Sequence, residues 1–155
     1  ETLAKEEYLR IGVSDLFFAP ERFARGYAQA RRALELSARL APDRAVCLYH
    51  DCAFYDLLSA LPQSSAPGQF CHPALSILSR YDRDSGSDLY HTLETYLACS
   101  CSVKETAERL FIHRNSLDYR LSRIRALTGL GLEDADVRFQ LSMSYRIDHF
   151  TGLDG

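Results

Sequence analysis

The sequence lacks long apolar stretches and an export signal. Its longest uninterrupted apolar runs, such as residues 16–19, are far shorter than the ~20 residues needed to cross a bilayer. The first residues have neither the basic start nor the apolar centre of a signal peptide, and no methionine opens the chain. We therefore expect a cytoplasmic protein that contacts no membrane and a chain that is a fragment of a longer one.

A disulfide framework and a zinc motif are also missing. The five cysteines are an odd number without scaffold spacing, and Cys99 and Cys101 are too close for the C-x2-C pair of a zinc site. Free cysteine packs as a small apolar residue, so we expect reduced thiols and neither metal nor cofactor. A metal or redox site around His50 or Cys71 and His72 is the minor alternative.

Catalytic motifs are missing as well. The chain has no nucleophile elbow, HExxH motif, P-loop or paired metal-binding carboxylates. Neighbouring polar residues such as His50 and Asp51 do not by themselves form a catalytic constellation. We therefore expect that the protein is not an enzyme.

Net charge is small, but its distribution is uneven. A formal charge of -3 over 155 residues argues against a protein that coats nucleic acid by bulk charge. Residues 109–125 nevertheless hold five arginines against the single acid Asp118, which makes a local excess of +4. Arginine suits phosphates and guanine edges because its planar guanidinium can donate two parallel hydrogen bonds.

The composition, 46% hydrophobic and 25% charged, indicates a folded protein. Strand-like patterns cover residues 8–13 and 45–49, and helical spacing covers 20–42 and about 52–61. Two strands alone make a poor sheet, so we expect residues 1–61 to be a truncated α/β segment. Turn-forming residues then predict a linker at 62–69, followed by a helical domain at 70–155. The expected fold is mainly α.

Beyond the linker, helices are predicted at 73–81 and 88–98, with a turn at 82–87 between them. Ser102 and Glu105 have the spacing of a capping box, which predicts a helix start. A second helix is predicted at about 114–126, with Leu117, Leu121 and Ile124 on its inner face and Gly129 after its end. Ala107 is small enough to let these two helices cross closely, as in a helix-turn-helix.

The face of the second helix opposite its apolar stripe is polar and free of acids. At 100° per residue it holds Asn115, Tyr119, Ser122 and Arg123, with Ser116 beside them. Such a helix fits the major groove, where asparagine and arginine can recognise adenine and guanine edges. The alternative is an arginine-rich face that only contacts solvent.

At these residues the sequence resembles a known family. Residues 106–124, with the segment His-Arg-Asn-Ser-Leu-Asp-Tyr-Arg-Leu, are similar to the C-terminal helix-turn-helix of PucR/CdaR-type bacterial transcription regulators. The similarity extends over about residues 70–148 through Tyr81, Asp82 and the segments 92–97 and 128–130. More faintly, residues 11–14, 28–36 and 46–49 resemble the end of the GGDEF-like middle domain of such regulators. The GGDEF signature itself is absent, so cyclase activity is not implied.

The resemblance, together with the helix geometry, leads to a set of DNA-binding candidates. The turn and second helix are also similar to the Fis-type helix-turn-helix, in which positions matching His113, Arg114, Ser116, Asp118 and Tyr119 approach DNA. We expect contacts to base edges from Arg114, Asn115, Ser116 and Tyr119. We expect contacts to phosphates from Ser102, Lys104, Thr106, Arg120 and Arg123.

Two candidates depart from the family pattern. Ser116 replaces the usual threonine and keeps the hydroxyl. Asp118 stands where a basic or neutral residue is expected. It either accepts a hydrogen bond from a cytosine amino group or pairs with Arg114 or Ser122.

The last segment has conflicting signals. Residues 137–147 alternate between apolar and polar, which by period alone predicts a strand, whereas the family resemblance implies a helix, which we favour. A helix would place Val137, Leu141 and Tyr145 on one side, and Phe139, Met143 and Ile147 nearly opposite. The second side would bind another copy in a homodimer, or else lie buried within one chain.

The sequence as a whole predicts a sequence-specific DNA-binding transcription regulator whose recognition helix spans about residues 114–126. Its partners would be double-stranded DNA and a second copy of the chain, and a small-molecule effector would bind outside this fragment. The alternative is a protein-interaction or effector-sensing fragment whose helix-turn-helix contacts protein.

Overall fold

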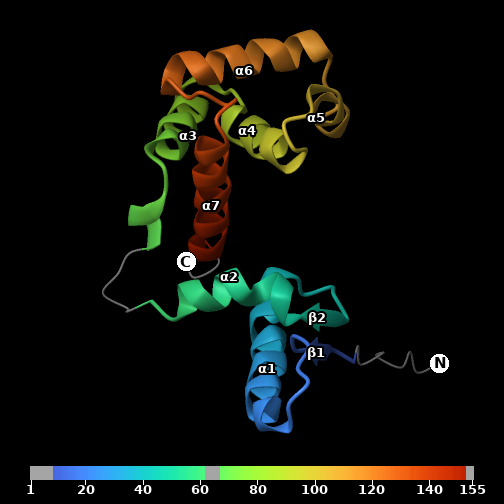
Figure 1. Ribbon diagram of the computed structural model, residues 1–155. Helices are drawn as coiled ribbons and strands as arrows, with labels where there is room; N and C mark the ends of the chain where they lie inside the picture. Colours follow the sequence, from blue (N-terminus) through green and yellow to red (C-terminus); the bar gives the residue numbers. More distant parts are fainter. Residues whose placement is uncertain (1–8, 62–66, 153–155) are drawn as a thin grey trace, which may run out of the picture. The chain divides into compact units, whose positions relative to one another are not determined.

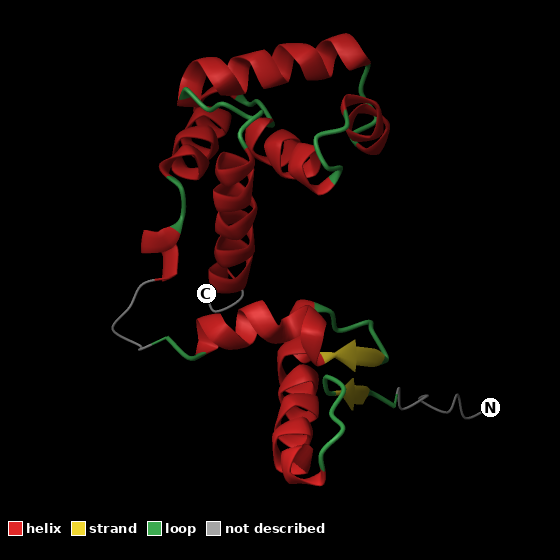
Figure 2. Cartoon of the chain, viewed as in Figure 1, coloured by secondary structure: helices red, strands yellow, loops and turns green. Residues whose placement is uncertain are grey.

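The computed structural model describes residues 9–61 and 67–152, and the chain divides into two compact units, residues 1–65 and 66–155 (Figure 1). Over the described residues the chain is mainly helical, with one sheet of two short strands (Figure 2). The expected mainly α fold is confirmed. Most of the predicted linker, positions 62–66, lies outside the described residues, and a short 3-10 helix, η2 (Pro67–Phe70), follows it.

The N-terminal unit is a strand-helix-strand-helix segment. Strands β1 (Ile11–Val13) and β2 (Val46–Leu48) pair in parallel, with Ile11 opposite Val46. They are connected through a 3-10 turn, η1 (Pro20–Arg22), and helix α1 (Phe23–Leu40). Helix α2 (Tyr49–Ser59) begins three residues earlier than predicted, directly after β2.

Strand β1 lies against the backbone of α1 at a glycine. A Cβ atom added to Gly12 would stand 2.1 Å from the carbonyl oxygen of Ala30 and 2.8 Å from Cγ of Leu34. No side chain fits there without moving the strand away from the helix. The packing of this unit therefore requires glycine at position 12.

Helices α1 and α2 are joined by polar contacts of Asp56. Its carboxylate accepts a hydrogen bond from Nε of Arg32 at 2.6 Å and another from the Tyr49 hydroxyl at 2.8 Å. The hydrogen bond from Arg32 lowers the pKa of Asp56, and the Tyr49 hydroxyl adds to this against the opposing effect of burial. The charged carboxylate is therefore the form that this contact favours.

Over its described residues, 67–152, the C-terminal unit consists of η2 and five helices: α3 (Pro73–Ser85), α4 (Leu89–Ala98), α5 (Val103–Arg109), α6 (Arg114–Thr128) and α7 (Ala135–Gly152). Helix α6 runs across α3 and α4 and packs against both as well as against α5 (Figure 1). Their shared core is centred on side chains without solvent exposure, namely Leu78, Leu93, Leu117, Ile124 and Leu141.

The end of helix α3 differs from the sequence prediction. Helix α3 continues four residues beyond Tyr81, into the segment predicted as a turn, and ends at Gly86, whose φ is +65°. Glycine adopts this left-handed conformation without steric cost, and its N–H donates to the carbonyl of Asp82 at 2.9 Å. The turn between α3 and α4 is therefore shorter and tighter than expected.

The C-terminal segment is helix α7, as the family resemblance implied, and not the strand suggested by its alternation. Leu141 and Tyr145 are buried and Val137 packs beside them, as predicted for the inner side. On the other side Phe139 is 68% exposed, but Ile147 is buried. The prediction that Ile147 faces a partner is therefore wrong, because this part of α7 is covered within the chain.

Among the described residues, no helix has both the length and the apolarity that a membrane span requires. Within the same residues, no group of three or more histidine, cysteine or acidic side chains is arranged to hold a metal ion.

Candidate nucleic-acid interface

Helix α5 begins at Ser102, whose hydroxyl oxygen accepts a hydrogen bond from the N–H of Glu105 at 3.3 Å. The serine half of the predicted capping box is thus present. Lys104 is exposed in the first turn, and Ala107 is buried where α5 meets α6. Thr106 is fully buried, and its hydroxyl donates to the carbonyl of Ser102 at 2.7 Å. The assignment of Thr106 to a phosphate contact is therefore corrected, because no ligand outside the protein can reach it.

The turn between α5 and α6 has the hydrogen bonds of a Schellman motif. The N–H of Ile112 donates to the carbonyl of Ala107 at 3.0 Å, and that of Phe111 donates to Glu108 at 3.2 Å. Phe111 stands at the position that usually holds glycine, with φ at +54°, and its side chain is 95% exposed. The helix-turn-helix geometry therefore includes a strained, solvent-exposed phenylalanine.

The residues that flank helix α6, His113 and Gly129, cap its two ends. Nδ1 of His113 accepts a hydrogen bond from the N–H of Asn115 at 3.2 Å. At the other end Gly129 has a φ of +68°, and its N–H donates to the carbonyl of Arg125 at 2.8 Å. The helix predicted at about 114–126 is confirmed and extends two residues further, to Thr128.

The outward face of α6 is exposed. Leu117, Leu121 and Ile124 are buried in the core, so the residues on the other side of the helix point away from it. These residues are Asn115, Ser116, Tyr119, Ser122 and Arg123, all exposed, and the Tyr119 side chain is 72% exposed. The polar face expected from the sequence is thus exposed to solvent.

One flank of α6 carries Arg114 and Asp118. Their side chains, one helical turn apart, form an exposed ion pair with 3.8 Å between Nε and Oδ2. This pairing is one of the three alternatives considered for Asp118. Arg114 also borders a shallow groove of about 680 Å³ with residues of α5, among them Lys104 and Ala107. This flank of α6 therefore faces α5.

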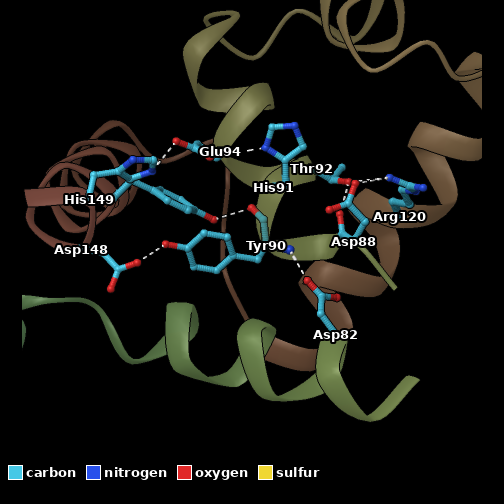
Figure 3. A network of polar contacts seen from close by, with 10 residues as sticks. Asp82, Asp88, Tyr90, His91, Thr92, Glu94, Arg120, Asp148 and His149 are labelled. Carbon is cyan, nitrogen blue, oxygen red and sulfur yellow. Dashed lines mark hydrogen bonds and ion pairs between the residues drawn. The ribbon is translucent and has the colours of Figure 1, made fainter. Parts of the chain in front are cut away.

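The opposite flank carries Arg120 and Arg123, which are both held by residues of other helices. Arg120 Nη1 donates to the Thr92 hydroxyl at 2.9 Å and lies 3.4 Å from a carboxylate oxygen of Asp88 (Figure 3). Arg123 Nε donates to the Tyr81 hydroxyl at 3.1 Å, and its guanidinium carbon lies 5.0 Å from the centre of that ring. Contacts within the protein therefore hold both arginine side chains along this flank before any ligand binds.

Asp82 of α3 holds the N-terminus of α4. Its carboxylate accepts hydrogen bonds from the N–H groups of Leu89 at 2.9 Å and Tyr90 at 2.8 Å, and from the Ser87 hydroxyl at 2.6 Å. Asp88 occupies the N-cap position but makes no side-chain cap bond. The Asp88 carboxylate is consequently available to Arg120.

Helix α7 is attached to the other side of α4 (Figure 3). The Tyr145 hydroxyl donates to the carbonyl of Tyr90 at 2.8 Å, and the Tyr90 hydroxyl donates to Asp148. Burial first, and the Asp148 carboxylate second, raise the pKa of Tyr90, so this hydroxyl stays protonated and donating at neutral pH. Glu94 pairs with His149 at 2.8 Å. These contacts stabilise the helical core and lie apart from the outward face of α6.

Residues on the second flank form one wall of a groove of about 540 Å³. The wall from α6 consists of Asn115, Ser116, Tyr119, Arg120 and Arg123, and the other wall consists of Tyr81 and residues 85–89. The structure thus divides the predicted site residues between two flanks of α6 and a shared outward face. The second wall could not be predicted from the sequence, because no spacing in the sequence relates it to α6.

Comparison with known proteins supports this geometry. Residues 89–147, from the start of α4 into α7, match the PucR C-terminal helix-turn-helix domain. The resemblance to PucR/CdaR-type regulators is thereby confirmed.

Several proteins that are similar to this chain are named as regulators. The chain is 36% identical over 93 residues to the proline-responsive transcriptional activator PutR of Bacillus subtilis. This alignment covers 60% of the chain and 23% of that protein. The chain is 29% identical over 139 residues to the carbohydrate diacid regulator of Escherichia coli, and this alignment covers 90% of the chain and 35% of that protein. It is 33% identical over 122 residues to the purine catabolism regulatory protein of Bacillus subtilis, covering 78% and 22%. The chain thus spans about a third or less of the length of these relatives.

Proposed function

We propose that this chain is the DNA-binding part of a transcription regulator and that α6 is its recognition helix. The observation that carries the proposal is the outward face of α6, where Asn115 and Tyr119 are exposed, while the neighbouring acid Asp118 lies on the flank and pairs with Arg114. An α-helix fits the major groove, and asparagine can donate to and accept from an adenine edge. The match to the PucR C-terminal domain and the names of the relatives support the same function.

Each flank of α6 would face the backbone of one DNA strand. A helix lying in the major groove has one sugar-phosphate backbone on either side. In the proposed complex, Ser102 and Lys104 of α5 contact one backbone, and Arg120 and Arg123 contact the other. Arg114, Asn115, Ser116 and Tyr119 approach base edges, and His113 and Asp118 lie beside them. Whether Asp118 leaves Arg114 for a cytosine depends on the operator.

Binding to duplex DNA at several salt concentrations tests this function. Each phosphate that the protein neutralises contributes about -0.9 to the slope of log K against log salt. We expect a slope corresponding to several phosphates, and retention on heparin. A complex with another protein that is insensitive to salt, and no binding to any duplex, would instead support the alternative in which the helix-turn-helix contacts protein.

Two arginines with different assigned roles give a sharper test. After a binding-site selection on random duplexes, Arg114→Ala should cost about 1–3 kcal/mol on the selected site and relax the preference at one base pair. Arg123→Ala should weaken binding to all sequences alike. Arg146→Ala on α7, which also removes an exposed positive charge but on another helix than α6, is the control. Equal losses on selected and random duplexes for Arg114→Ala would contradict its role.

We also propose that residues 1–61 belong to a separate GGDEF-like α/β domain and take no part in DNA binding. The parallel pairing of β1 and β2 is typical of a larger α/β sheet. Gly12→Val would push β1 away from α1 and disrupt this unit alone. DNA affinity within a factor of two of the original chain is expected, and a loss of binding would show that the two units depend on each other.

Homodimerisation remains part of the proposal, with a smaller contact surface than predicted. Phe139 is exposed on the outer side of α7 and Met143 is half-buried, whereas Ile147 is covered. A dimer would recognise two half-sites about 34 Å apart, or a multiple of that distance. An effector, as predicted, would bind a part of the protein outside this chain.

A further inference from the structure

We define the α3–α4 turn as residues 85–88, from the last residue of α3 to the residue before α4. It lies beside the recognition helix. Together with Tyr81 and Leu89 it forms the second wall of the groove whose first wall is Asn115, Ser116, Tyr119, Arg120 and Arg123 of α6. None of these turn residues was identified from the sequence as a DNA contact. The groove has a volume of about 540 Å³ and is open to solvent.

The shape of this turn leaves room beside the arginines. Gly86 has no side chain, and a Cβ added there would meet no atom within 4 Å. Ser85 and Ser87 are small, and their hydroxyl oxygens lie 2.8 Å apart. A lysine or leucine side chain at these positions would project into the groove, whereas the residues present leave it free for a polar ligand.

The charge of the groove comes mainly from α6. Arg120 and Arg123 both lie on this wall, and their contacts with Thr92 and Tyr81 keep them there without a ligand. The opposing charge is that of Asp88, whose carboxylate lies 3.4 Å from Arg120. Two fixed guanidinium groups beside a small, hydroxyl-bearing turn are suited to an elongated phosphate ligand.

We propose that this groove holds the sugar-phosphate backbone of one DNA strand, with the α3–α4 turn as its outer wall. The proposal rests on the function proposed above and adds a surface to it. When α6 lies in the major groove, its Arg120–Arg123 flank faces one backbone, and the turn follows that backbone from the outside. The other backbone is contacted by α5.

Asp88 then reduces the affinity for phosphate. Its carboxylate repels a phosphate in the groove and partly neutralises Arg120. It does not cap α4, because the Asp82 carboxylate accepts the hydrogen bonds from Leu89 and Tyr90. Asparagine at position 88 would therefore remove the charge and leave the helix start intact.

The test compares charge changes at two serines of α3. Ser85 lines the groove, and Ser76 does not. Both are exposed, and both hydroxyls donate to a backbone carbonyl of their own helix. Nine residues of helix place them about 13 Å apart. The probe is a duplex of about 30 base pairs of mixed sequence, and affinity is measured with the whole chain by fluorescence anisotropy at several salt concentrations.

Ser85→Glu is expected to weaken binding about tenfold at low salt and to make the salt slope shallower by about 0.9. Ser76→Glu should stay within a factor of two of the original chain. Ser85→Lys should bind more tightly than Ser76→Lys, which keeps the test valid if a glutamate at position 85 disturbs the helix end. Asp88→Asn should bind several-fold more tightly, with a steeper slope.

Equal effects at positions 85 and 76 would overturn the proposal, because they would reflect overall charge alone. An Asp88→Asn variant with unchanged affinity and slope would also overturn it. Failure of the original chain to bind any duplex would refute the proposed DNA-binding function itself, and this outcome is distinct from the other two.

Discussion

Replacing Asp82 with alanine should destabilise the C-terminal unit strongly, although Asp82 lies at the edge of the core. Its carboxylate accepts three hydrogen bonds, from the N–H groups of Leu89 and Tyr90 and from the Ser87 hydroxyl. Two of these satisfy backbone donors at the start of α4 that have no partner within the helix. Alanine would leave these donors to water or without partners.

The size of the effect follows from these contacts. Loss of a helix cap costs about 0.5–2 kcal/mol, and a hydrogen bond to a charged group contributes about 1.5–3 kcal/mol. Water can replace part of what is lost, because the site is only partly buried. We therefore expect the free energy of unfolding of the C-terminal unit to fall by about 2–4 kcal/mol. Arg120 should also become less well fixed, since its partner Thr92 belongs to the first turn of α4.

The assay is chemical unfolding followed by circular dichroism, together with amide hydrogen exchange at Leu89 and Tyr90. The control is Asp84→Ala, on the same helix but exposed, where a change of less than about 0.5 kcal/mol is expected. Faster exchange at Leu89 and Tyr90 should accompany the loss of stability in Asp82→Ala. Equal stability of the two variants, or unchanged exchange at these amides, would refute the role given to Asp82.

Three other perturbations have expected outcomes. Phe111→Gly should stabilise the chain by about 0.5–1 kcal/mol in thermal unfolding, because glycine relieves the positive φ and little burial is lost; a destabilised variant would contradict this. The pKa of Asp56 in the folded state lies below its ordinary value of 3.8, so its contact with Arg32 stabilises fully above about pH 4 and is lost as the pH falls. In Asp56→Asn, unfolding of the N-terminal unit should accordingly depend less on pH in this range, and an unchanged acid transition would count against the contact. Phe139→Glu should shift sedimentation toward the monomer, and a folded variant with an unchanged monomer-dimer balance would remove α7 as the dimer surface.

Much of the helix-turn-helix could be predicted from the sequence because its signals are local. Ser102 at the start of α5, the apolar stripe of Leu117, Leu121 and Ile124, and Gly129 after α6 all act through neighbours within one or two turns. The polar outward face follows from the same periodicity. The resemblance to PucR/CdaR-type regulators then connected this face to DNA and correctly favoured a helix for residues 137–147, against their alternation.

The tertiary structure decided which polar residues are accessible and which elements lie beside α6. Thr106 is polar, as residues that contact a ligand at the surface usually are, but it lies on the inner side of α5 and is buried. Asp88 stands at a cap position, yet Asp82 from another helix makes the cap bonds and leaves Asp88 to Arg120. The turn at residues 85–88 meets α6 only through the packing of α3 and α4 against it. Periodicity describes one helix at a time, whereas Asp82 bonds to the start of the next helix and Asp88 meets Arg120, 32 positions further along the chain. Packing geometry decides such contacts between helices.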